Sequence, residues 1–345
     1  MKDFFNKLLT GMSIGIIVSL IPNALVGEIL KLIIPHVPIL QHILDISVLV
    51  MSMLPVIIGV TVGLTFKLTP IQTASVGLAA MVGSGVVQIS TEGAMMLSGI
   101  GVVINTGVTA GLAVLFVKYI GARLKDYTIL LLPALTIFVP GLIGFMLLPY
   151  VRTGSGYVGV VIDQITLLQP IIMGATIAVI FCILILSPLS TIGVATVIML
   201  SGIGAGAANL GVVASGVGMC IASYKANSLG TALAHVLGSP KIQMRNFFMK
   251  PSIALPMMIT AAILGALAGV VEVTGTPISA GFGLAGLVGP LNYINLAEGG
   301  WNLHNITVML GMFFVLPIIL NIMLLRLFER KFKLITAEDY KVHIE

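Results

Sequence analysis

The sequence predicts an all-α polytopic membrane protein with about ten membrane segments, including glycine-rich broken or re-entrant helices. Of its 345 residues, 58% are hydrophobic and only 8% are charged, whereas about a quarter of the residues of soluble domains are charged. Apolar runs of about 20 residues, the length that one crossing needs, recur along the whole chain. The Lys and Arg residues also fit one membrane topology. We therefore expect a single integral membrane domain over residues 1–345.

The membrane segments are predicted from these apolar runs in chain order. The first, at about residues 8–34, follows Lys2 and Lys7 and is too long for the apolar core of a signal peptide, so we expect it to remain as a helix. The glycine-rich parts near 77–93 and 201–218 could form broken helices instead of plain ones. The nine further segments lie at about 44–66, 70–90, 97–117, 127–150, 169–187, 189–204, 206–223, 251–271 and 304–325.

The distribution of basic residues predicts the orientation, because Lys and Arg collect on the cytoplasmic side of membrane segments. With both termini in the cytoplasm, fifteen of the seventeen basic residues fall on that side, and only Lys31 and Arg152 do not. The net charge of +5 is then explained by attraction to the anionic cytoplasmic leaflet, and it requires no nucleic-acid partner.

Two pairs of stretches predict an internal repeat with repeat-like halves at about 44–117 and 169–223. "LPVIIGVTVGLTF" (54–66) resembles "QPIIMGATIAVIF" (169–181), and "TPIQTASVGLAAMVGSG" (69–85) resembles "SPLSTIGVATVIMLSGIG" (187–204). Repeats often frame the substrate site of a transporter. Chance similarity between apolar segments is the alternative interpretation, and both parallel and inverted arrangements of the copies stay open.

The stretch "GFGLAG" (281–286) fits the G-x-G-x-x-G pattern of dinucleotide-binding proteins. That fingerprint needs a preceding strand and an acidic residue about 20 positions later, but Glu298 is only twelve residues beyond Gly286. Thr276 as a helix N-cap and Pro277 at the first helical position predict a half-helix to about Val288 instead. We expect this half-helix to form a re-entrant loop at about 275–292, with a plain membrane segment as the alternative.

The best site candidates follow directly, in "PLNYINLAEGGWNLHN" (290–305). This stretch combines amides, a carboxylate, an imidazole and the only Trp of the chain, which are groups that bind hydroxyls and the apolar face of a sugar ring. The alternative interpretation is an extracellular loop with an interfacial aromatic anchor. The candidates in this stretch are Asn292, Asn295, Glu298, Trp301 and His304.

Three further polar residues are candidates because polar groups at membrane depth are costly and usually functional. Glu92 could instead be a loop carboxylate, and Asn105 and Asn209 could instead form interhelical hydrogen bonds. The two cysteines, Cys182 and Cys220, stand alone in apolar runs and are expected to pack in the core. Neither a metal cluster, a catalytic triad nor a Walker loop is recognised in the sequence, so we predict no cofactor, no metal and no autonomous catalysis.

The charged stretches predict cytoplasmic elements. Residues 225–250 mix basic and apolar positions, which favours an amphipathic connector along the membrane interface; a docking site for a soluble partner is the alternative. The tail at 329–345 is short and charged, and we expect it to cap the last helix in the cytosol.

Three stretches carry a resemblance to a known family: "SPLSTIGVATVIMLSGIGAGAANLGVVASGVG", "NSLGTALAHVLGSPKIQMRNFFMKP" and "GTPISAGFGLAGLVGP". They resemble the IIC-like integral membrane proteins of the phosphotransferase system, of the perfringolysin-O regulator type. The resemblance implies a multi-pass permease fold in a bacterial plasma membrane, with re-entrant elements and a homodimer. It also makes Glu298 and His304 look like the Glu and His that sugar permeases of the wider group hold near their substrate, although the Glu-containing motif of the better-known members is not reproduced.

The predicted function is that of a permease-like protein that binds and transports a small polar solute, such as a sugar or a sugar-like acid. One alternative is a membrane sensor or regulatory protein that binds its ligand without net transport. The other is the IIC subunit of a phosphotransferase complex. That subunit would need separate soluble phosphocarriers, because the sequence has no polar, domain-sized segment suited to carrying phosphate.

Overall fold

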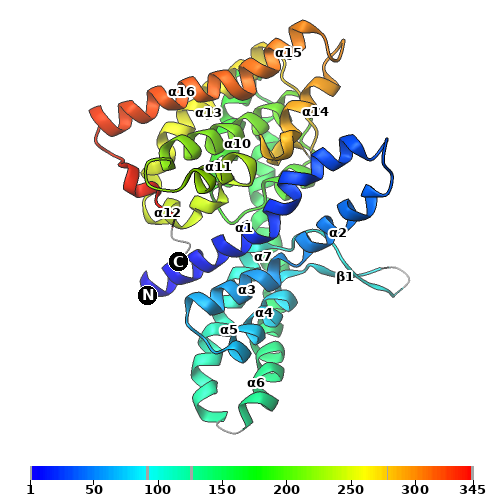
Figure 1. Cartoon of the computed structure of the whole chain (residues 1–345), viewed down its shortest axis with the longest axis vertical. Helices are drawn as coiled ribbons and strands as arrows, with labels where there is room; N and C mark the ends of the chain where they lie inside the picture. Colours follow the sequence, from blue (N-terminus) through cyan, green and yellow to red (C-terminus); the bar gives the residue numbers. More distant parts are fainter. Residues whose placement is uncertain (1, 91–92, 125–126, 278, 343–345) are drawn as a thin grey trace. The chain divides into compact units, whose positions relative to one another are not determined.

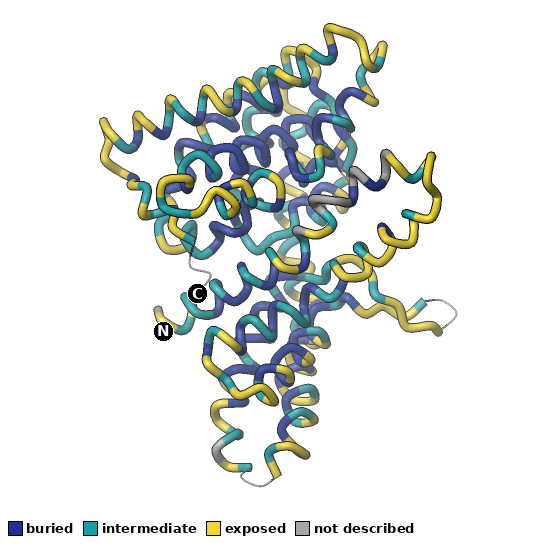
Figure 2. Tube along the Cα trace, in the orientation of Figure 1, coloured by how far each residue is buried: buried dark blue, intermediate teal, exposed yellow. Residues whose placement is uncertain are grey.

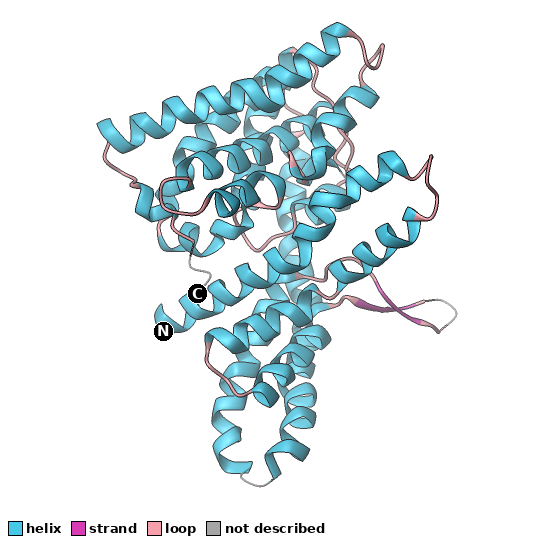
Figure 3. Ribbon diagram, viewed as in Figure 1, coloured by secondary structure: helices cyan, strands magenta, loops and turns pink. Residues whose placement is uncertain are grey.

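The computed structural model describes residues 2–90, 93–124, 127–277 and 279–342. These residues form two compact units, one from residues 2–23 and 30–154 and the other from residues 24–29 and 155–342. Helices dominate both units, and the described part of the chain has a single pair of short strands (Figure 3). Each unit contains one copy of the predicted repeat, and the single integral membrane domain stays a prediction.

The first unit is a helical bundle with one hairpin (Figure 1). The strands pair antiparallel, with Val87 opposite Leu97, and helices α2 and α3 meet at a bend of 50°. Helix α7 follows α6 and the π-helical turn η2 without interruption and continues into the second unit. The elements are α1 (Lys2–Ile33), α2 (Leu40–Ser52), α3 (Leu54–Thr65), α4 (Pro70–Ser84), β1 (Val87–Ile89), β2 (Met95–Leu97), α5 (Val103–Leu124), α6 (Thr128–Thr136), η2 (Ile137–Gly141) and α7 (Leu142–Ile165).

The second unit is built around helix α10, which is buried along almost its whole length (Figure 2). Helices α8 and α13 pack against it and against each other. The elements are α8 (Pro170–Leu184), α9 (Thr191–Val197), α10 (Gly202–Ser223), α11 (Leu229–Leu237), η3 (Pro240–Gln243), α12 (Met244–Met249), η4 (Pro251–Ala254), α13 (Leu255–Val270), η5 (Ser279–Gly281), η6 (Ala285–Leu287), α14 (Val288–Leu296), α15 (Leu303–Leu310), η7 (Gly311–Val315), α16 (Leu316–Arg326), η8 (Leu327–Lys331) and η9 (Ala337–Tyr340).

Six helices of the described chain are long and apolar enough to cross a membrane, or seven if the bent pair α2–α3 is one span. The ten predicted segments are therefore not confirmed in number. The segment predicted at 189–204 forms only the short helix α9 before the chain breaks, and the one predicted at 70–90 ends at Ser84 because Gly85 takes a left-handed φ of 71°. The six helices span 3–20, 103–121, 128–165, 202–223, 251–270 and 303–331.

Each repeat copy forms a helix, a Pro-containing turn and a second helix: α3 and α4 in one unit, α8 and α9 in the other. The first turn is closed locally, because Thr69 and Gln72 form a reciprocal capping box. In the second turn Ser190 caps α9, but the preceding carbonyls of Ser187 and Leu189 each accept a 2.6 Å hydrogen bond from the distant Lys241. The turn of the second copy is thus held by the side chain of Lys241, which lies in the connector at residues 225–250.

Candidate functional site

The described residues of the glycine-rich loop, 275–277 and 279–287, contain no half-helix, so the half-helix predicted from Thr276 to Val288 is wrong. Thr276 does cap a turn, because the Ser279 N–H donates to its Oγ1 at 3.2 Å. The chain then forms only the 3-10 turns η5 and η6 before α14 begins. Gly283 and Gly286 have φ of 62° and 60°, and a right-handed helix cannot pass through such residues.

Two asparagines hold the loop in place. The buried N–H of Gly283 donates to Asn209 Oδ1 of helix α10 at 2.8 Å, and the N–H of Thr276 donates to Asn292 Oδ1 of α14 at 3.2 Å. Because both oxygens satisfy backbone groups, these two candidates position the loop in this structure. Asn209 is 1% exposed, whereas Asn292 is half-buried, and its Nδ2 has no hydrogen-bond partner within the described part of the chain.

A third contact joins the loop to the second repeat copy. Thr191 Oγ1, in the first turn of α9, donates to the carbonyl of Gly281 at 3.1 Å. The backbones are so close that a Cβ on Gly281 would lie 2.6 Å from the nitrogen of Ile192. Glycine is required here for close approach, and the loop is fixed to both α9 and α10.

The remaining candidates of this stretch lie on the surface around the turn between α14 and α15. Asn295 is exposed on α14, Glu298 and Trp301 are exposed in the turn, and His304 is exposed in the first turn of α15. Among the described residues, the hydrogen bonds and ion pairs do not engage the side chains of these four residues. These four residues thus lie exposed on one short stretch, and their role in binding a ligand stays a prediction.

The buried Asn305, which is 5% exposed, holds the backbone of the turn between α14 and α15. Its Nδ2 donates to the carbonyls of Glu298 at 2.9 Å and Gly300 at 2.8 Å, while its N–H donates to the capping Asn302 Oδ1 at 2.7 Å. This framework fixes the positions from which Glu298 and Trp301 project. The composition of the stretch indicated an amide here but not its inward direction.

The candidates of the first unit lie elsewhere in the chain. Asn105 of α5 is fully buried, and its Nδ2 donates to the carbonyls of Gly83 and, at 2.7 Å, Gly144. It therefore joins α4, α5 and α7, which is the interhelical role that was its alternative interpretation. Glu92 lies outside the described residues.

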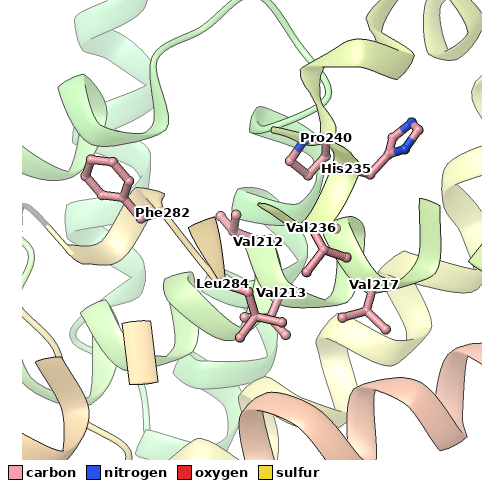
Figure 4. Close-up of a pocket in the computed structure, with 9 residues that line it drawn as sticks. Val212, Val213, Val217, His235, Val236, Pro240, Phe282 and Leu284 are labelled. Atoms are coloured by element: carbon pink, nitrogen blue, oxygen red, sulfur yellow. The ribbon is translucent and has the colours of Figure 1, made fainter. Parts of the chain in front are cut away.

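A small cavity lies between α10, α11 and the glycine-rich loop (Figure 4). Its volume is about 10 Å³, enough for about one water molecule, so in this conformation it does not admit a sugar. The imidazole of His235 points away from the valine and leucine side chains (Figure 4). The cavity is lined by Val212, Val213, Gly216, Val217, His235, Val236, Pro240, Phe282 and Leu284.

The sequence of this chain also matches a known protein family. The family described as "Phosphotransferase system, EIIC" matches residues 6–342. The chain belongs to this family. The match covers both units, the glycine-rich loop and the connector, so it confirms the resemblance carried by the three quoted stretches. Searches of curated proteins and of solved structures find no match to this chain.

Membership of the EIIC family, together with the apolar helices, makes the chain a multi-pass membrane protein and a membrane component of a sugar phosphotransferase system, which works with other components of that system. The orientation of the termini and the homodimer stay predictions.

The connector of this EIIC protein buries polar groups that the sequence interpretation did not single out. His235 is fully buried; its Nδ1 donates to the carbonyl of Ala232 at 3.0 Å and its Nε2 accepts from Gln243 Nε2 at 3.1 Å. Burial lowers the pKa of His235 to about 4, and burial lowers the pKa of the Lys241 ammonium to about 7. Meanwhile Leu229, Leu233 and Leu237 of α11 are exposed at four-residue intervals, which suits the predicted interfacial connector.

The lowered pKa of His235 predicts a loss of stability in mild acid. Between the ordinary pKa of 6.5 and the folded value of about 4, the unfolded chain binds a proton that the folded chain excludes, so stability falls as pH falls, by about 1.4 kcal/mol per pH unit. We expect the apparent Tm of the detergent-solubilised protein to fall more from pH 6.5 to 5.5 than that of His235→Gln, whose side chain does not titrate. Parallel Tm curves for the two proteins over this range would contradict this assignment.

Proposed function

We propose that this EIIC-family protein binds and transports a small polyhydroxylated solute, a sugar or a sugar-like acid, through contacts made by residues 292–304. The observation that carries the proposal is the turn between α14 and α15. There a buried asparagine fixes the backbone, while Glu298, Trp301 and His304 remain exposed and unpaired among the described residues.

The chemistry of these side chains favours a polyol. A carboxylate accepts hydrogen bonds from two neighbouring hydroxyls, an imidazole both donates and accepts, and an indole face covers the apolar side of a sugar ring. Asn295 and the Nδ2 of Asn292, which has no partner among the described residues, supply further donors on the same stretch. Because Asn209 and Asn292 fix the preceding loop, this set of groups is placed on a supported backbone.

Transport would proceed as in other carriers built from repeats, by movement of one helical group past another around a site in the membrane. Phosphorylation of the solute would require separate soluble phosphocarriers, as membership of the EIIC family suggests. The sensor interpretation differs from transport alone and from transport coupled to phosphorylation, because it predicts that the ligand binds without crossing the membrane.

The test is a reconstituted transport assay. A thermal-shift screen of the purified protein against sugars, polyols and organic acids identifies a ligand, because binding to the native state raises its apparent Tm. We then expect counterflow of that ligand in proteoliposomes, and we expect Glu298→Gln to lower its rate at least tenfold, a loss of about 1.4 kcal/mol. Glu272→Gln is the matched control, since this carboxylate is exposed on another turn of the same unit.

The outcomes separate the alternatives. Ligand binding with no flux would favour the sensor, and formation of a phosphorylated product on adding phosphoenolpyruvate and cell extract would show that transport is coupled to phosphorylation. Equal binding and flux in wild type and Glu298→Gln would overturn the assignment of the site to this stretch.

A further inference from the structure

The tail at Phe332–Val342 folds back onto the second unit. The side chain of Ile335 is 2% exposed and that of Tyr340 is 1% exposed. The Tyr340 Oη donates to the carbonyl of Ile253 at 3.0 Å, and burial raises the pKa of Tyr340. The tail was expected only to cap the last helix, but the described part of it is docked across the connector.

Amide side chains of the connector, residues 225–250, form hydrogen bonds with the backbone of the tail. The carbonyl of Tyr340 accepts from Asn227 Nδ2 at 2.9 Å and from Gln243 Nε2 at 2.8 Å. The N–H of Val342 donates to Asn227 Oδ1 at 2.8 Å, so one amide holds a carbonyl and an N–H two residues apart. Hydrogen bonds to the main chain give a peptide site affinity that does not depend on the peptide's side chains.

A third amide side chain, that of Asn246, and the side chain of Lys250 make further contacts with the tail. Asn246 Nδ2 donates to the carbonyl of Lys341 at 2.8 Å, and it also donates to Gln243 Oε1 at 2.7 Å, so the amides support one another. Lys250 Nζ lies 2.7 Å from Asp339 Oδ2, and this contact helps to hold the pKa of Asp339 below its usual range. The Asp339 carboxylate is therefore held by Lys250 as well as by Thr336 of the tail itself, and the Tyr340 hydroxyl is held by the carbonyl of Ile253.

We propose that Asn227, Gln243, Asn246 and Lys250 form a binding site for an acidic–aromatic peptide whose Asp-Tyr lies in a 3-10 turn, as in η9, and that the chain's own tail occupies this site in cis and can be displaced. The ligand has an Asp followed by a Tyr, with a free backbone carbonyl at the Tyr and a free N–H two residues later. This site is independent of the proposed solute site. Among the described residues, the backbone of the tail forms no backbone–backbone hydrogen bond with residues 225–250. The tail is therefore held there through side-chain contacts that a second copy of the same peptide could also make.

The test is direct competition on the full-length protein in detergent. The probe is a fluorescein-labelled synthetic peptide, LITAEDYKV, which is the sequence of residues 334–342. In wild type the tethered tail competes at an effective concentration of about 1 mM, so the peptide binds weakly. The full-length variant Tyr340→Ala loosens the tail, and we expect it to bind the peptide at least tenfold more tightly by anisotropy.

Two controls test the specificity of this binding. A peptide with Ala in place of its Tyr should not bind the Tyr340→Ala protein, and adding Asn227→Ala to that protein should abolish binding of the native peptide. Gln164→Ala, which truncates an exposed amide elsewhere in the unit, should leave binding unchanged. A Tyr340→Ala protein that elutes and melts like wild type but binds the peptide no more tightly would overturn the proposal.

A second measurement serves if Tyr340→Ala does not fold. Hydrogen exchange of the tail amides in the wild-type protein should be slow, and Asn227→Ala should speed it at least tenfold while Gln164→Ala does not. Tail amides that exchange in wild type as fast as those of the free peptide would show that the tail does not occupy the site, and the proposal would fail.

Discussion

Gly265→Ala is expected to lower the stability of the protein by about 3 kcal/mol, at the upper end of the cost of overpacking, which corresponds to a fall in apparent Tm of roughly 6 to 12 °C. A Cβ on Gly265 of α13 would press on the carbonyl of Gly174 of α8 and would lie 2.5 Å from the Cβ of Ala178. Because the main obstacle is backbone, a rotamer change cannot relieve it, and the two helices would have to separate.

This crossing is costly to disturb because helices in a bilayer are held by close packing and not by exclusion from water. Gly269, one turn further along α13, is equally restricted, since its Cβ would lie 2.5 Å from the carbonyl of Pro170. The reciprocal change, Gly174→Ala, would press on the carbonyl of Gly265. We therefore expect the double variant to cost less than the sum of the two single changes, because the first already separates the helices.

The matched control is Gly311→Ala, in another membrane helix of the same unit. A Cβ there meets nothing within 4 Å, and Ala is the better helix former by roughly 1 kcal/mol, so its apparent Tm should stay level or rise. The measurement is thermal unfolding in detergent at a fixed scan rate, with size-exclusion elution as the check on folding. If the apparent Tm of Gly265→Ala equals that of Gly311→Ala, the close approach of α8 and α13 is refuted.

The sequence predicted the membrane class and the family well, because both depend on signals that are summed over many residues. Length, low charge and the three stretches that carry the family resemblance together extend over tens of positions, so an error at one position changes little. The number of spans depended on single residues. The prediction of a crossing at 189–204 could not foresee that Met199 has a left-handed φ of 51° and ends the helical run.

The candidate site was predictable only in part, for a related reason. The exposed groups Glu298, Trp301 and His304 stand together in the sequence, so local composition was enough to single them out. Asn209 acts on Gly283, which is 74 positions away, and Gln243 acts on Tyr340, which is 97 positions away. Such contacts are set by tertiary packing, and no local pattern shows which way a buried amide points.

Asn209→Ala is the second large effect that we expect, with a loss of about 3 kcal/mol, since a buried donor without a partner alone costs about 1–3 kcal/mol and the truncation leaves a void beside it. The N–H of Gly283 would lose its partner in the interior of the unit. Gly289 packs against the same oxygen, because its own Cβ would lie 2.9 Å from Asn209 Oδ1. The variant should therefore loosen the glycine-rich loop where it leads into α14.

Hydrogen exchange of a peptide covering 279–289 measures this loosening directly, and we expect it to speed at least tenfold in Asn209→Ala. Ser215→Ala is the comparison on the same helix: its buried hydroxyl donates to the carbonyl of Cys182 at 2.9 Å and does not contact the loop. That change should cost about 1 kcal/mol, the net contribution of an ordinary hydrogen bond, and leave exchange at 279–289 as in wild type. If Asn209→Ala also leaves this exchange unchanged, the loop is held by Thr191 and Asn292 alone, and Asn209 is left free for the ligand contact first predicted for it.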